Sequence, residues 1–130
     1  MLEQMMFPAL EQGGYEATGQ QVIGLKPHGR KHKVDTIATK NRQSILISQK
    51  WQQSGGTAEE KVAFEVICLA DAIKKSNGKF SKAIVVLGGD GWTLRDWYVN
   101  GGLKSHIVDH ALVEVLTLEQ FVARANKGKL

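Results

Sequence analysis

The chain has 130 residues, 42% of them hydrophobic, with a formal net charge of +4. This length suits one domain, expected over residues 1–130, and the mild positive charge alone hardly favours nucleic acid. No apolar run reaches the ~18 residues of a membrane helix, no signal peptide pattern opens the chain, and the single Cys68 excludes a disulfide framework, so we expect a soluble cytoplasmic protein without a membrane partner.

The first half of the chain predicts one helix followed by strands. Residues 2–12 favour a helix only weakly because Pro8 falls inside, and the glycine pair at 13–14 would end it. Residues 15–25 have strand-like content. The stretches 33–39 (KVDTIAT) and 44–51 (SILISQKW) predict two strands, and the turn at 40–43 between them indicates a hairpin.

The second half predicts a long helix between strands. Thr57 and Glu60 form a capping box, so we expect a helix from there to about Lys75. The apolar residues at helical spacing on its inner face are Val62, Val66, Leu69 and Ile73. Residues 82–89 predict a strand covered on both faces, 93–99 a short helix, 110–117 a last strand and 118–127 an end helix. This order predicts a mixed α/β fold, an α+β sheet flanked by helices.

A basic segment precedes the predicted hairpin. The stretch 26–33 (KPHGRKHK) contains Lys26, Arg30, Lys31 and Lys33, and Lys40 and Arg42 follow closely. One interpretation is a solvated basic loop. The other is an edge that contacts phosphates, which would make DNA the partner.

Two charged residues occupy positions that suit apolar side chains. Lys50 lies in an apolar strand pattern, and Glu65 lies in the helical run VAFEVICLA near the inner stripe. A buried, unpaired carboxylate costs several kcal/mol, so it usually has a partner. A structural Glu65–Lys50 ion pair, or a helix rotated to expose Glu65, would explain both residues without a function.

A metal site is the functional alternative. The hairpin can bring Asp35 close to Lys50, and two carboxylates, Asp35 and Glu65, suffice for Mg²⁺, which keeps several waters. Lys50 would then orient the attacking water and offset phosphate charge. This combination is typical of metal-assisted phosphodiester hydrolysis.

The stretches HKVDTIAT and ILISQKWQ resemble the PD-(D/E)xK nuclease superfamily, with its restriction-endonuclease-like αβββαβ core. Members usually carry Asp on one strand of a hairpin and (D/E)-x-K on the next. Here Ser48 replaces the second carboxylate. A known variant of the superfamily moves that carboxylate to the following helix, and Glu65 matches it.

The resemblance implies a Mg²⁺-dependent DNA endonuclease of restriction, homing or junction-resolving type, with Mn²⁺ able to replace Mg²⁺. Asp35, Lys50 and Glu65 would be catalytic, and Ser48 and Glu16 would support them. A chain with one site would cut both strands as a homodimer or larger homo-oligomer.

Two other functions stay open. Ser48 is also compatible with a catalytically decayed protein of the same fold that binds nucleic acid or serves in assembly. The glycine-rich stretch LGGDGWTL at 87–94 follows a strand and precedes a short helix, so it could cradle the phosphate of a nucleotide. It lacks the complete phosphate-loop pattern, and a tight strand-to-helix turn explains it better.

Overall fold

A five-stranded mixed sheet forms the centre of the computed structural model, which describes residues 2–52 and 58–130. Its strand order is β1-β4-β5-β6-β7, with β1, β4 and β5 antiparallel and β5, β6 and β7 parallel. The strands are β1 (Glu16–Thr18), β4 (Thr36–Lys40), β5 (Gln43–Trp51), β6 (Phe80–Gly88) and β7 (Val113–Thr117). The predicted mixed fold is therefore confirmed.

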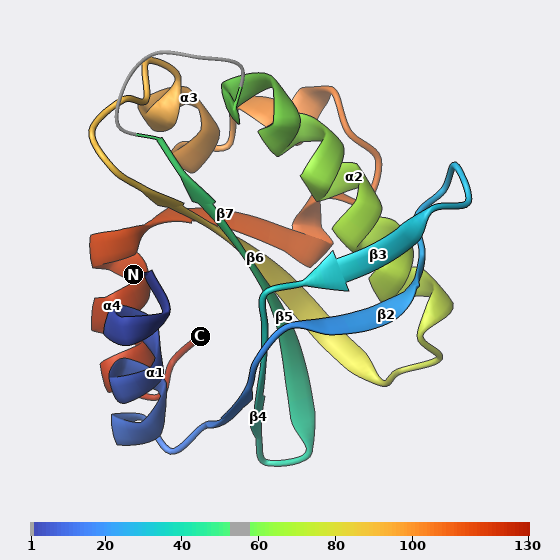
Figure 1. Ribbon diagram of the computed structural model, residues 1–130. Coiled ribbons are helices and arrows are strands. Elements are labelled where there is room, and N and C mark those ends of the chain that lie inside the picture. The colour runs from blue at the N-terminus through green and yellow to red at the C-terminus, as the bar shows by residue number, and fades with distance from the viewer. Residues whose placement is uncertain (1, 53–57) are drawn as a thin grey trace.

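Helices cover both faces of this sheet (Figure 1). The helices α1 (Leu2–Gln12) and α4 (Leu118–Asn126) pack on one face, and α2 (Ala58–Lys75) packs on the other. Side chains alternate along β5, so Ile45 and Ile47 join the α1–α4 core while Leu46 joins the α2 core. The predicted inner stripe of α2 is confirmed, because all four of its residues are buried in the α2 core.

A two-stranded antiparallel sheet lies against α2, apart from the main sheet (Figure 1). It consists of β2 (Gln21–Leu25) and β3 (Lys31–Val34), and we call it the ribbon. Ile23 packs against the α2 core, and the His28 ring lies 5.5 Å from the Phe64 ring of α2, measured between centroids. These contacts hold the ribbon on the helix.

The predicted strand over 33–39 is wrong as one element. The chain bends at Asp35, where it leaves β3 of the ribbon and enters β4 of the main sheet. The stretch 15–25 likewise divides into β1 and β2, which belong to different sheets. One continuous strand cannot pair with both sheets, so each stretch breaks where the chain changes sheet.

The predicted hairpin is confirmed for β4 and β5. Thr36 pairs with Ile47, and the register continues to Lys40 opposite Gln43. Asn41 and Arg42 form the turn with φ of 53° and 67°. A two-residue turn with positive φ at both positions matches the right-handed twist of the strands that it joins.

The segment after β6 contains less strand than predicted. A helix α3 (Arg95–Val99) is followed by two 3₁₀ turns, η1 (Gly102–Ser105) and η2 (His110–Leu112), so β7 begins only at Val113. Thr117 caps α4 and forms a capping box with Gln120. The capping box predicted at Thr57 lies outside the described residues. Over the described ranges, no helix combines the length and hydrophobicity that crossing a membrane requires.

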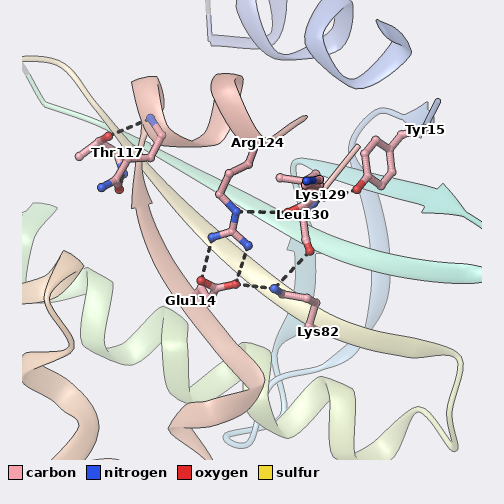
Figure 2. A network of polar contacts seen from close by, with 8 residues as sticks. Tyr15, Lys82, Glu114, Thr117, Arg124, Lys129 and Leu130 are labelled. Carbon is pink, nitrogen blue, oxygen red and sulfur yellow. Dashed lines mark hydrogen bonds and ion pairs between the residues drawn. The ribbon is translucent and has the colours of Figure 1, made fainter. Parts of the chain in front are cut away.

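A network of polar contacts connects the C-terminal part of the chain to the sheet (Figure 2). Arg124 donates two hydrogen bonds to the Glu114 carboxylate, of 2.9 and 3.0 Å, and Lys82 pairs with the same carboxylate. The hydrogen bonds from Arg124 are the largest cause that lowers the Glu114 pKa, and Lys82 lowers it further, to about 2. Partial burial acts in the opposite direction and raises the pKa. Lys82, Glu114 and Arg124 thus join β6, β7 and α4. The Leu130 amide donates to the Tyr15 hydroxyl at 2.9 Å, and this bond connects the end of the chain to the segment after α1.

Candidate active site

Lys50 and Glu65 meet between β5 and α2. The Lys50 ammonium lies 3.6 Å from Glu65 Oε2, and the side chains are 26% and 11% exposed. Lys50 is near the C-terminal end of β5, level with Leu87 of β6. The pair therefore lies at the C-terminal edge of two parallel strands, with its lysine partly exposed.

His32 is a third member of this group. It lies on the inner face of β3, is 1% exposed, and its Nε2 lies 3.1 Å from Glu65 Oε1. A carboxylate only accepts hydrogen bonds, so Nε2 donates. His32 was not among the residues predicted from the sequence. The alternation of exposed Lys31 and Lys33 with buried His32 and Val34 could have indicated its inward orientation.

The two neighbours keep the Glu65 carboxylate ionised. Burial raises the pKa of Glu65, but the hydrogen bond from His32 and the charge of Lys50 oppose this, so the net pKa is lowered. The charge of Lys26, on the loop of the ribbon, also lowers it. Glu65 is thus a buried anion held by groups from β3 and β5.

Asp35 lies beside the same end of β5. Thr36 is opposite Ile47, so Asp35 is level with Ser48 in the register of the hairpin. Its Oδ2 accepts a 2.7 Å hydrogen bond from the Gln49 backbone N–H. Ser48 is 3% exposed and shares the strand face of Lys50. The fold therefore brings Asp35, Ser48, Lys50 and Glu65 to the C-terminal end of β5.

The donor set suits a hard divalent cation. Asp35 and Glu65 offer carboxylate oxygens, the ligands that Mg²⁺ and Mn²⁺ accept. In the part of the chain that the structure describes, no group of three or more His, Cys, Asp or Glu side chains is placed to hold a metal ion. A cation here would therefore take most of its ligands from water or substrate, as Mg²⁺ usually does.

Three predicted site residues lie elsewhere. Glu16 pairs with Thr39 of β4. Thr39 is four residues beyond Asp35, so Glu16 lies roughly 13 Å from the Asp35 end of the strand at 3.3 Å per residue. Lys40 donates to the Gly13 and Gly128 carbonyls, at 2.7 and 3.3 Å, and so fastens the end of the sheet. Arg42 is exposed in the β4–β5 turn, at the opposite end of β5 from Lys50.

The other predicted basic residues lie on the ribbon. Arg30, Lys31 and Lys33 are exposed, and Lys26 is half-buried with its ammonium 6.0 Å from the centre of the Phe64 ring. Between residues 17 and 34 the chain has these four cations and no Asp or Glu. The ribbon is therefore a surface of one charge sign next to Glu65.

The glycine-rich stretch after β6 makes hydrogen bonds and close contacts within the fold. The Glu59 carboxylate accepts hydrogen bonds from the Thr93 hydroxyl at 2.7 Å, the Leu94 amide at 2.8 Å and the Thr93 amide. Gly89 has a φ of 90°, and a Cβ there would lie 2.3 Å from the Gln52 carbonyl oxygen. The Thr93 and Leu94 amides are thus occupied by Glu59, the Gly91 amide donates to the Gln52 carbonyl, and a structural turn explains the glycines.

Comparisons with known proteins concern the family and the fold of the chain. A family profile described as a PD-(D/E)XK nuclease superfamily domain matches residues 1–129. Among solved structures, the crystal structure of AF1548, a protein of unknown function, is similar with a TM-score of 0.53 and 11% identity, over 89% of this chain. At 11% identity the likeness concerns the fold alone, and the chain covers 57% of that protein's length. The comparison with curated proteins found no match.

Proposed function

Because this chain belongs to the PD-(D/E)XK nuclease superfamily, we propose that it is a metal-dependent endonuclease that hydrolyses phosphodiester bonds of DNA. The observation that carries the proposal is the buried Glu65 carboxylate 3.6 Å from the Lys50 ammonium, at the strand end beside Asp35. Apolar residues at both positions would stabilise the fold at least as well as this ion pair, so packing alone does not explain it. Members of the superfamily generally use divalent metals.

The chain's own residues would divide the chemistry between them. Asp35 and Glu65 would hold Mg²⁺ or Mn²⁺, which when bound supplies a Lewis acid and a water of lowered pKa. Lys50, the more exposed member of its ion pair, orients the attacking water and offsets the charge that builds on the phosphate. Ser48 has a supporting place between them.

The ribbon would supply the DNA contacts. Arg30, Lys31 and Lys33 are exposed, and Lys26 is close enough to affect Glu65 through its charge. Cations on one surface neutralise backbone phosphates and release counterions, which favours binding. This arrangement would bring the DNA backbone to the side of the molecule where Lys50 is accessible.

The test is cleavage of plasmid, branched and single-stranded DNA with and without Mg²⁺ or Mn²⁺. We expect Lys50→Ala and Glu65→Gln to lower the rate about 100-fold or more, the range seen when a charge-stabilising group is removed. Glu60→Gln is the matched control, because Glu60 is exposed on the same helix. Thermal unfolding of each variant checks that the fold remains. Full activity of Lys50→Ala would overturn the site.

A binding protein with a decayed site is the second candidate. Ser48 favours it, because a buried serine stands where the superfamily usually has a carboxylate. The two candidates differ in metal affinity. If the protein binds DNA but shows no measurable Mn²⁺ affinity and no cleavage, the binding function is correct and the nuclease is not.

A further inference from the structure

His32 is the buried residue of the site that the proposed chemistry does not use. We propose that it is a positioning residue, which fixes the orientation of the Glu65 carboxylate for cation binding and joins that carboxylate to the ribbon. This role rests on the proposed function, since it concerns the same site. No proton transfer is assigned to His32.

The geometry fixes both oxygens of the carboxylate. His32 Nε2 lies 3.1 Å from Oε1, and the Lys50 ammonium lies 3.6 Å from Oε2. One partner comes from β3 and the other from β5, so rotation of the carboxylate would break one contact or both. Lys50 has a long side chain that is 26% exposed, whereas the His32 side chain is 1% exposed. His32 is therefore the firmer of the two constraints.

Packing alone does not explain a histidine at this position. Its Nδ1 is buried and has no hydrogen-bond partner in the described part of the chain. A buried polar atom without a partner costs stability, so an apolar side chain would hold the ribbon on α2 more favourably. The imidazole is better explained by the one hydrogen bond that it makes, which is to Glu65.

The same contact links the carboxylate to the proposed DNA surface. His32 points inward from β3, while its neighbours Lys31 and Lys33 point outward. One face of β3 thus contacts Glu65 through His32, and the other face carries the exposed cations. Residues that orient a metal ligand in this way typically change metal affinity about 10- to 100-fold when they are replaced.

The experiment measures Mn²⁺ affinity, by electron paramagnetic resonance of the free ion, in the absence of DNA. We expect His32→Leu to weaken Mn²⁺ binding about 10- to 100-fold relative to the unaltered protein. His32→Gln should recover most of the affinity, because its amide nitrogen can reach the place of Nε2. His32→Asn, whose amide nitrogen is one carbon shorter in reach, should not recover it.

The matched control is Val34→Ala. Val34 is 1% exposed on the same face of β3 and packs in the α2 core, so its truncation loosens the ribbon. It should lower the urea midpoint of unfolding and leave Mn²⁺ affinity within about twofold, because its apolar side chain makes no hydrogen bond to the Asp35 or Glu65 carboxylate. If His32→Leu does not fold, the comparison of His32→Gln with His32→Asn decides instead.

The outcomes separate the two proposals. Equal Mn²⁺ affinity in the unaltered protein, His32→Leu and His32→Asn, with cleavage intact, overturns the positioning role and leaves the nuclease standing. Equal weakening in His32→Leu and Val34→Ala, or equal affinity in His32→Gln and His32→Asn, reduces the contact to packing and also overturns it. An unaltered protein without Mn²⁺ affinity or cleavage overturns the nuclease and the positioning role with it.

Discussion

Glu65 illustrates how a small domain keeps a carboxylate ionised below its surface. Burial works against the charge, and a histidine, a lysine from β5 and a lysine from the ribbon loop work for it. Removing one partner from such a group leaves a charge that is poorly compensated, which is far more costly than never having buried it. This asymmetry makes the residues around Glu65 sensitive to single substitutions.

Glu114 allows a prediction about pH at the level of one residue. Its pKa is about 2 in the folded protein, against an ordinary value of 4.5, chiefly because of the bond from Arg124. A lowered pKa means that Glu114 contributes stability above pH 4.5 and loses it as the pH falls from 4.5 toward 2. We expect Glu114→Gln to unfold at a lower urea midpoint than the unaltered protein at neutral pH, with a smaller difference near pH 2.

Glu119→Gln serves as the control for this series. Glu119 is exposed in the first turn of α4, close to Glu114 in sequence but outside its network. Its replacement should shift the urea midpoint little at either pH. A Glu114→Gln protein that is destabilised equally at neutral and acidic pH would show that the ion pairs with Arg124 and Lys82 contribute no pH-dependent stability.

Among the elements, the ribbon is the one that we expect to contact DNA. Replacing Arg30, Lys31 and Lys33 with alanine should weaken DNA binding and flatten its dependence on salt, because fewer counterions are released. The log–log slope should fall by about 0.9 for each phosphate that the variant no longer neutralises. Fluorescence anisotropy of a labelled duplex over a range of salt, without divalent metal, measures the slope.

A second triple variant keeps the change in net charge the same. Lys104, Lys127 and Lys129 are exposed and lie outside the ribbon, so their replacement by alanine should leave the slope nearly unaltered. If the two triple variants flatten the slope equally, the ribbon has no special part in binding. DNA would then respond only to the overall charge.

The elements could largely be predicted from the sequence, but not the sheets to which they belong. Helical spacing indicated α2 and its buried stripe, and two strand-like stretches with a turn between them indicated the β4–β5 hairpin. The break at Asp35 is invisible in the run KVDTIAT, since the residues on both sides suit strands. The chain leaves the ribbon for the main sheet at the point set by the packing of the ribbon on α2. No local sequence pattern encodes that packing.

The site was predictable to a similar degree. A lysine and a glutamate in apolar surroundings indicated Lys50 and Glu65, and the structure brings them together. His32 was missed because its partner lies 33 residues away along the chain. Lys40 was assigned to DNA from its charge alone, whereas its hydrogen bonds to two carbonyls depend on how α1 and α4 meet.

For the whole molecule, the arrangement carries a prediction about assembly. One chain offers one candidate site, and cutting both strands of a duplex requires two. We expect a homodimer or larger homo-oligomer, visible by sedimentation velocity over a range of concentrations. Plasmid should then pass directly to the linear form. A protein that stays monomeric at every concentration and accumulates only nicked circles would contradict this expectation.

The placement of the chain ends has a practical consequence. Both ends lie by α1 and α4, and Tyr15 and Leu130 are joined by a hydrogen bond, on the face of the sheet that faces away from α2 (Figure 1). Lys50 and Glu65 belong to the opposite face. A surface tether, an affinity tag or a fused reporter at either end would therefore leave the face with Lys50 and Glu65 uncovered.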